Sequence, residues 1–145
     1  MASERPIEIL LVEDNPGDIL LTLETFKVAK ILNQVHVVSN GREAMDYLRK
    51  MMGTMTLPDL ILLDLNLPEI DGRKLLAMIK ADEVLSRIPV IVLTASSSDE
   101  DVLISYNLKA DGYVTKPFDM RQVLKVVACI EEFGISITKL ATARA

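Results

Sequence analysis

The chain has 145 residues, 50% of them hydrophobic and 26% charged, a composition that predicts one globular domain rather than a disordered segment. Its net charge of −5 argues against a general affinity for nucleic-acid phosphates or anionic lipid. The single cysteine, Cys129, excludes an internal disulfide and fits a reducing compartment. The start is not leader-like, and no apolar run approaches the ~20 residues of a membrane helix, so we expect a soluble, cytoplasmic protein.

The first half of the chain alternates between predicted strands and helices. Asn15 followed by Pro16 indicates a helix start, because asparagine caps helix N-termini and proline is favoured at the first helical position. Ile19, Leu23 and Phe26 then recur at helical spacing. In order, the sequence predicts a strand at 7–12, a helix from 16 to about 30, a strand at 35–38, and a helix after the turn at 40–41, followed by a loop at 53–58.

The second half continues the alternation around a central apolar strand. Four consecutive apolar residues at 60–63 lie between Pro58 and Pro68, which suits a strand buried on both faces. There follow a helix after 71–72, a strand at 89–93, a weakly amphipathic helix from the cluster at 96–99, a strand at 111–115 and a helix over 123–130. Five strand–helix repeats predict a doubly wound α/β domain with a five-stranded parallel sheet in the flavodoxin-like order 2-1-3-4-5. We expect a core at 7–133 and a tail at 134–145.

His36 and Cys129 have structural interpretations. His36, the single histidine, alternates with Val35 and Val37 along a predicted strand and has no ligand partners at suggestive spacing. Cys129 lies within the last predicted helix, where a small packed residue is a simpler interpretation than a reactive thiol. Neither residue is expected to carry the function.

Four of the five predicted strands end in polar or charged residues. Glu13 and Asp14 follow the first strand, Asp64 the third, Thr94 the fourth and Lys116 the fifth. Taken singly, each has an ordinary explanation as a helix cap, a turn residue or a solvated charge. Because all strands of a parallel sheet end at one edge, where α/β proteins bind ligands, the positions together predict a functional site.

The residue types at this edge suit phosphoryl transfer. Three neighbouring carboxylates repel one another, and Mg²⁺, which prefers hard oxygen ligands, removes that penalty. Lys116 adds a positive charge and Thr94 a hydroxyl donor, so these groups form a cradle for a phosphoryl group with Asp64 as the nucleophile. The six glycines are scattered and form no nucleotide-binding loop, so the phosphoryl group is expected from another protein or a small donor.

These motifs resemble the receiver domain of two-component response regulators over residues 7–133. The matching positions are the acidic pair at 13–14, Asp64 within the segment 62–68, the pair at 71–72, Thr94 with Ala95, and Lys116 with Pro117. The resemblance implies that Asp64 accepts a phosphoryl group from a sensor histidine kinase. It also implies a signalling protein rather than an enzyme, although one that catalyses its own phosphorylation and dephosphorylation.

The resemblance assigns roles to individual residues as well. The implied Mg²⁺ ligands are Glu13, Asp14, Asp64 and the backbone carbonyl of Asn66. The implied phosphoryl contacts are Thr94 and Lys116, the switch pair is Thr94 and Tyr113, and the peptide bond before Pro117 is expected to be cis. On this basis we expect the surface of the fourth helix, fifth strand and fifth helix to change on phosphorylation.

A narrower similarity indicates the single-domain regulators that partner phytochrome-type histidine kinases. It rests on the segments 12–18, 64–68 and 106–113. The sequence departs from that group at Asp111 and Gly112, where asparagine and cysteine are more usual, and in the tail. Because the residues after Pro117 suffice only for a helix and a tail, we expect a stand-alone regulator that acts on a downstream protein by contact.

Two alternatives remain open at this point. A haloacid-dehalogenase-like phosphatase also places an aspartate after a strand, but its second catalytic aspartate would fall on Asn66, which cannot act as an acid or base. A pseudo-receiver that serves only as a binding module would not need the complete set of acids, threonine and lysine. Phosphorylation of Asp64 would decide among the three functions.

The last predicted helix also suggests a homodimer. Leu124, Ala128 and Phe133 lie outside the stripe that would pack on the sheet, whereas the far side of such a helix should be polar. The tail adds further apolar residues. We therefore expect two copies to pair through the fourth helix, fifth strand, fifth helix and tail. The simpler alternative is a frayed tail with scattered surface apolar residues.

Overall fold

The computed structural model describes residues 6–65, 67, 72–95 and 110–132, and within them five strands form one parallel sheet. The strands are β1 (Ile7–Val12), β2 (Asn33–Val38), β3 (Leu60–Asp64), β4 (Val90–Thr94) and β5 (Gly112–Thr115). Their order, β2-β1-β3-β4-β5, confirms the predicted flavodoxin-like topology. Every neighbouring pair is parallel, so all five strands end at the same edge of the sheet.

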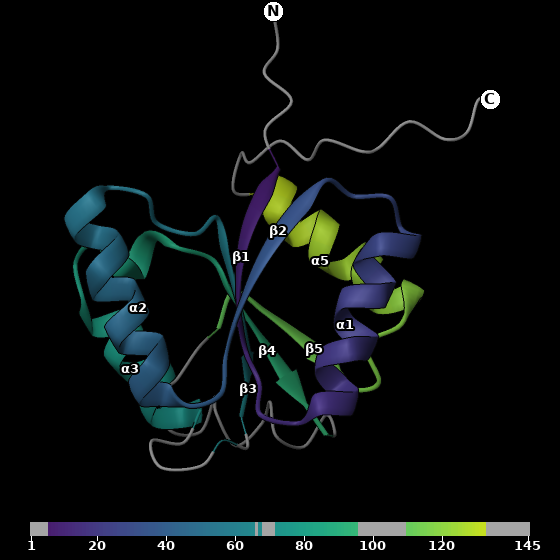
Figure 1. The fold of residues 1–145 in the computed structure, drawn as a ribbon, viewed down its shortest axis with the longest axis horizontal. Helices are drawn as coiled ribbons and strands as arrows, with labels where there is room; N and C mark the ends of the chain where they lie inside the picture. Colours follow the sequence, from purple (N-terminus) through teal and green to yellow (C-terminus); the bar gives the residue numbers. More distant parts are fainter. Residues whose placement is uncertain (1–5, 66, 68–71, 96–109, 133–145) are drawn as a thin grey trace, which may run out of the picture.

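In the described part of the chain, four α-helices cover the two faces of this sheet (Figure 1). α1 (Pro16–Val28) and α5 (Met120–Glu132) lie on one face, and α2 (Gly41–Thr54) and α3 (Gly72–Ala81) lie on the other. A short 3₁₀ turn, η1 (Leu85–Arg87), leads from α3 into β4. The predicted fourth helix falls on residues 96–109 and lies outside the described residues. None of the described helices is long and apolar enough to cross a membrane.

Backbone pairing and capping move three boundaries from their predicted positions. β2 begins at Asn33, two residues before the apolar run, because it pairs with β1 from the first residue of that strand onward. α1 ends at Val28 rather than near Lys30, whose φ of 58° is left-handed. α2 continues to Thr54, where Met55 takes the left-handed conformation and ends the helix. The loop before β3 is therefore shorter than predicted.

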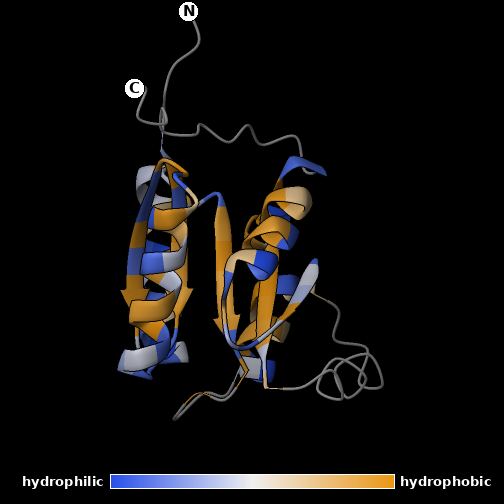
Figure 2. Cartoon of the chain, turned by 90° about the vertical axis from the view of Figure 1, so that its right-hand side faces the viewer, coloured by the Kyte–Doolittle hydropathy of each residue, from blue (hydrophilic) through white to orange (hydrophobic). Residues whose placement is uncertain are grey.

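β3 lies between two hydrophobic layers, as its continuous apolar sequence predicts. Leu60 and Leu62 pack in the layer on the side of α1 and α5, and Ile61 and Leu63 pack in the layer on the side of α2 and α3. All four side chains are fully buried, and Figure 2 shows how strongly apolar the strands are. Each such side chain stabilises the fold by about 1.5–3 kcal/mol, so β3 holds Asp64, its last residue, in a fixed place.

The inner face of α1 is more polar than predicted. Thr22 and Thr25 are buried there, whereas the predicted Ile19 and Leu23 are only partly buried. Each threonine hydroxyl donates to the backbone carbonyl four residues earlier, at 2.8 and 2.7 Å, and Thr25 Oγ1 also lies 2.9 Å from the carbonyl oxygen of Phe118. These contacts offset the cost of burying a hydroxyl, and the last one ties α1 to the segment after β5.

His36 and Cys129 have the structural surroundings that their sequence positions predict. The ring of His36 is exposed on β2 and stacks on Tyr47 of α2, with ring centroids 4.1 Å apart. Cys129 is partly buried in α5, and its Sγ lies 3.5 Å from the carbonyl oxygen of Asp111. Both residues are explained by packing within the described part of the chain.

Gly72 begins α3 against the backbone at the end of β3. Its N–H donates to the carbonyl oxygen of Leu65 at 2.9 Å. A Cβ atom on this residue would lie 2.5 Å from both the carbonyl oxygen of Asp64 and the Cα of Leu65. Since non-bonded heavy atoms do not approach this closely in a packed interior, only glycine fits here. The contact therefore helps to fix the backbone of Asp64.

We expect Gly72→Ala to lower the free energy of unfolding by about 1–3 kcal/mol, because α3 or the end of β3 must move to admit the methyl group. Gly53→Ala in α2 is the matched control. A Cβ there meets no atom within 4 Å, and alanine should raise helix stability by about 0.5–1 kcal/mol. Urea unfolding followed by circular dichroism measures both. A Gly72→Ala variant at least as stable as the parent protein would contradict the close approach at Gly72.

Candidate functional site

The acidic pair follows β1 at the carboxyl edge of the sheet. Glu13 is fully buried, and its backbone N–H donates to the carbonyl oxygen of Val38 at 3.0 Å, which extends the pairing of β1 with β2. Asp14 is exposed. The chain then turns into α1 with the predicted cap, in which Oδ1 of Asn15 accepts the backbone N–H of Asp18 at 2.9 Å. The abrupt start of α1 keeps the acidic pair at the sheet edge.

Asp64 and Thr94 end the two adjacent strands β3 and β4. Asp64 is 4% exposed and Thr94 is 2% exposed. Asp64 is in register with Leu93, so Thr94 lies one residue further along the neighbouring strand. A carboxylate buried to this degree is costly unless charged or hydrogen-bonding partners compensate.

One oxygen from each of Glu13, Asp14 and Asp64 lies within 4.8 Å of the others, which makes a cluster of three carboxylates. The pKa of Glu13 is raised from 4.5 to about 7, mainly by burial and then by the hydrogen bond and negative charge of Asp64, while Lys116 acts in the opposite direction. Without a cation, the cluster therefore tends to hold a proton on Glu13.

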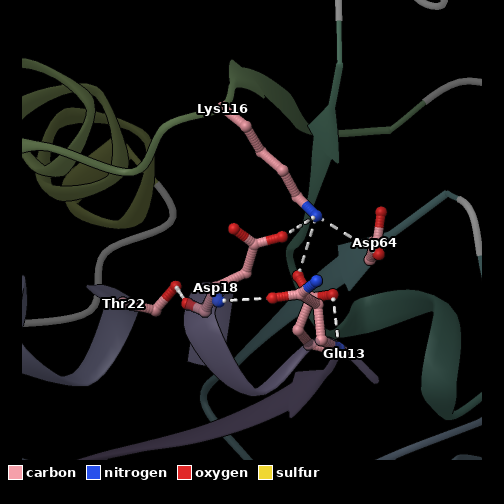
Figure 3. A network of polar contacts seen from close by, with 6 residues as sticks. Glu13, Asp18, Thr22, Asp64 and Lys116 are labelled. Atoms are coloured by element: carbon pink, nitrogen blue, oxygen red, sulfur yellow. Dashed lines mark hydrogen bonds and ion pairs between the residues drawn. The ribbon is translucent and has the colours of Figure 1, made fainter. Parts of the chain in front are cut away.

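The ammonium group of Lys116 lies between acids from three elements (Figure 3). Its Nζ is 2.9 Å from Oδ2 of Asp18, 3.0 Å from Oε1 of Glu13 and 3.3 Å from Oδ2 of Asp64. Burial alone would lower the pKa of Lys116, but the hydrogen bond with Asp18, the ion pair with Glu13 and the charge of Asp64 raise it above its ordinary value. The lysine is thus charged at neutral pH. Its single positive charge faces three carboxylates, those of Glu13, Asp18 and Asp64.

The carboxylate cluster fits a small, hard divalent cation. Oε1 of Glu13 is buried and makes no well-oriented hydrogen bond within the described residues, although Nζ of Lys116 lies at ion-pair distance. A bound cation can take the place of the hydrogen bond that such a buried oxygen lacks. Converging carboxylates are the ligands that Mg²⁺ and Mn²⁺ prefer, and the exposure of Asp14 leaves access for water ligands.

Thr94 and Lys116 lie at the same edge of the sheet as this cluster, whereas Asn66 lies outside the described residues. The backbone N–H of Lys116 donates to the carbonyl oxygen of Thr94 at 2.8 Å, so the lysine follows β5 next to the end of β4. The peptide bond between Lys116 and Pro117 is cis. Tyr113 of β5 is partly buried, and its hydroxyl accepts a backbone N–H from three residues earlier at 3.1 Å.

Asp18 is a site residue that the motif analysis does not identify. It lies in the first turn of α1, four residues after Asp14, where an acidic residue is also explained as a favourable charge near a helix N-terminus. Its contact with Lys116 joins residues 98 positions apart in the chain. The sequence signal is an aspartate within the segment 12–18, but the segment alone does not reveal the partner.

Comparison with known proteins identifies the family. Residues 9–128 match the family described as response regulator receiver domain. The chain belongs to this family. It is also 41% identical over 143 residues to response regulator Rcp1 of Synechocystis sp., a match that covers 97% of each chain. A receiver domain implies a histidine kinase as its partner and a signalling role rather than an enzymatic one.

Two solved structures are similar over nearly their whole length. The phosphorylated cyanobacterial phytochrome response regulator RcpA is 43% identical, with a TM-score of 0.72 over 92% of this chain and 99% of that chain. The Mn²⁺-bound form of Rcp1 is 40% identical, with a TM-score of 0.70 over 94% of this chain and 100% of that chain. The predicted similarity to phytochrome response regulators is confirmed, and neither the phosphatase nor the pseudo-receiver is favoured.

The raised pKa of Glu13 predicts how the stability of the metal-free protein changes with pH. The folded state holds a proton that the unfolded state releases above about pH 4.5. The stability contributed by this group is therefore present at low pH and is lost as the pH rises through about 7. We expect a loss on the order of 3 kcal/mol across this window in EDTA.

Glu13→Gln, which cannot titrate, should lack this part of the pH dependence. Urea unfolding of both proteins at several pH values between about 4.5 and 7.5 measures the difference. If the variant and the parent protein lose stability in parallel, the titrating group lies elsewhere.

Proposed function

We propose that this chain accepts a phosphoryl group on Asp64 from a phytochrome-type sensor histidine kinase and signals through phosphorylation-dependent protein contacts. The observation that carries this proposal is the position of Asp64. It ends the buried strand β3 beside two further carboxylates, and its Oδ2 lies 3.3 Å from the ammonium group of Lys116. The similarity to a phytochrome response regulator supports the type of kinase.

In the proposed reaction, a carboxylate oxygen of Asp64 attacks the phosphorus atom. The bond between phosphorus and the imidazole nitrogen of the kinase breaks, and an acyl phosphate forms on Asp64. Lys116 faces the negative charge of the transferred oxygens, and the hydroxyl of Thr94 donates a hydrogen bond to one of them. Thr94 is buried and Lys116 is partly buried, and this reduced contact with water strengthens both interactions. Bound Mg²⁺ would supply the positive charge that offsets repulsion between the phosphoryl group and the acids.

Glu13, Asp14, Asp64 and the backbone carbonyl of Asn66 are the proposed Mg²⁺ ligands. The three carboxylates converge at one point, and Glu13 is buried there. The Mn²⁺-bound form of Rcp1 supports divalent cation binding within this group of proteins. The carbonyl of Asn66 enters the proposal from the family resemblance alone.

Thr94 and Tyr113 are proposed to relay phosphorylation to the surface formed by β5, α5 and the predicted fourth helix. Thr94 ends β4, and Tyr113 lies on the neighbouring strand β5 in register with Val92. A shift of the Thr94 hydroxyl toward the phosphoryl group would be accompanied by an inward turn of Tyr113. That turn would break the hydrogen bond between the Tyr113 hydroxyl and the N–H of Ala110.

We expect Asp64→Asn to abolish phosphorylation by acetyl phosphate with Mg²⁺, because an amide is not a nucleophile, and to preserve the fold, because the shape is unchanged. Without metal, this variant should melt at or above the temperature of the parent protein, since one repelling charge is removed. Intact-protein mass spectrometry detects the phosphate. Asp46→Asn on the exposed side of α2 is the matched control and should be phosphorylated normally.

Two outcomes of this experiment would contradict the proposal. Added phosphate on Asp64→Asn would place the acceptor on another residue. A parent protein that takes up no phosphate would support a pseudo-receiver that works only as a binding module.

We further propose that residues 1–145 form a single receiver domain that acts in the cytoplasm as a stand-alone regulator. The match to Rcp1 over 97% of each chain supports this arrangement, and the single cysteine fits a reducing compartment. The proposal includes catalysis by the chain of its own phosphorylation and dephosphorylation, because the same site would serve both steps. The signal would then pass to a downstream protein by direct contact.

A homodimer that includes α5 is the proposed assembly. Met120 and Leu124 are 45% and 65% exposed, and Ala128 is also exposed. These residues recur every four positions, so one outward side of α5 is apolar. A two-fold dimer would also match a dimeric kinase. The predicted contributions of Phe133, the tail and the fourth helix lie outside the described residues.

We expect sedimentation velocity to show a dimer whose proportion rises with concentration and is reduced by Leu124→Glu, because a charge would be placed in the contact. Leu20→Glu is the matched control. Leu20 is 60% exposed on α1, a helix that is not part of the proposed contact surface. A full-length chain that remains a monomer at all concentrations would exclude this assembly.

A further inference from the structure

Asp18 contacts Lys116 but has no role in the reaction proposed above. Its Oδ2 accepts a hydrogen bond from Nζ of Lys116 at 2.9 Å, the shortest of the three ion pairs that Lys116 makes within the described residues (Figure 3). Asp18 does not belong to the cluster of Glu13, Asp14 and Asp64 that could hold a metal ion. It is partly exposed, whereas Glu13 and Asp64 are buried.

The position of Asp18 relative to Lys116 is fixed by packing. The backbone N–H of Asp18 is held by the cap residue Asn15, so Asp18 is anchored in the first turn of α1. α1 in turn contacts the segment just after Lys116. Thr25 Oγ1 lies 2.9 Å from the carbonyl oxygen of Phe118, and the ring centroid of Phe118 lies 5.4 Å from that of Phe26. These contacts tie the helix to the segment that follows the lysine.

This arrangement matters when the carboxylates of Glu13 and Asp64 bind a cation. The positive charge of the cation would then offset part of their attraction for Lys116. Asp18 does not belong to the cluster of three carboxylates, so a cation bound there would leave its attraction for Lys116 unchanged. A lysine side chain with no such partner samples many rotamers, and fixing it again when the phosphoryl group arrives costs conformational entropy.

We infer that Asp18 is a positioning residue that holds the ammonium group of Lys116 beside Asp64, ready to contact the transferred phosphoryl group. Asp18 does not touch the reacting atoms and acts only through Lys116. This inference rests on the proposed function of Asp64. A competing explanation is that Asp18 merely stabilises the N-terminus of α1 by its charge, a role that would not depend on Lys116.

A double-mutant comparison separates the two explanations. Asp18→Asn, Lys116→Ala and the double variant are compared with the parent protein by two measurements. The first is the rate of phosphorylation by acetyl phosphate with Mg²⁺, and the second is the affinity for beryllofluoride with Mg²⁺ by calorimetry. Glu24→Gln is the matched control, because it removes the same charge from the exposed side of α1.

We expect Asp18→Asn to lower both the rate and the beryllofluoride affinity by about three- to tenfold, which lies within the cost of immobilising one long side chain on binding. In the Lys116→Ala background, the same change should alter neither quantity by more than about twofold. Affinity for Mg²⁺ alone should also change little, because Asp18 is not a ligand. Asp18→Glu keeps the charge and should retain more activity than Asp18→Asn, which gives a second test if the asparagine variant unfolds.

Equal losses from Asp18→Asn with and without Lys116 would overturn the inference in favour of a purely structural role. No loss in either background would overturn it as well. If the parent protein neither takes up phosphate nor binds beryllofluoride, the proposed function fails, and the inference fails with it. A normal parent protein with an unaffected Asp18→Asn variant would contradict only the role of Asp18.

Discussion

The charge balance at the carboxyl edge of the sheet is the constraint on which the site depends. Glu13 and Asp64 are buried there, and Asp14 lies near enough to repel both. Removing carboxylates from water is costly, and placing them together raises that cost further. One ammonium group, that of Lys116, offsets part of the repulsion and leaves the site anionic. The remaining negative charge attracts a divalent cation. The positive charge of that cation would in turn reduce the repulsion between the site and an incoming phosphoryl group.

The fold holds this unfavourable charge in place through packing remote from it. β3 is fully buried over its whole length, and Gly72 lets α3 approach the backbone of Asp64 and Leu65 more closely than any side chain would permit. The acids cannot relax by moving apart, because the strands that carry them are neighbours in the sheet. Stability contributed by the apolar layers thus maintains a cluster that would otherwise disperse in water.

α1 connects the two sides of the site. It begins directly after the acidic pair, with Asp18 in its first turn, and it packs on Phe118, two residues beyond Lys116. Its buried threonines make this contact polar and directional rather than purely apolar. The lysine therefore contacts a helix from the opposite end of the chain, and this contact is the basis on which we propose that Asp18 affects phosphoryl transfer.

The sequence by itself determined the order of elements, the parallel topology and the residues at the strand ends, because the apolar periodicity is local and parallel strands must end at one edge. It also predicted Asp64 as the central residue of the site, and the structure places Glu13, Asp14 and Lys116 around it. Only the tertiary structure decided that Thr22 and Thr25 face inward and that Asp18 pairs with Lys116. Those contacts depend on the rotation and tilt of α1 against β5 and α5. Such rotations are set by long-range packing, which no local pattern of residues encodes.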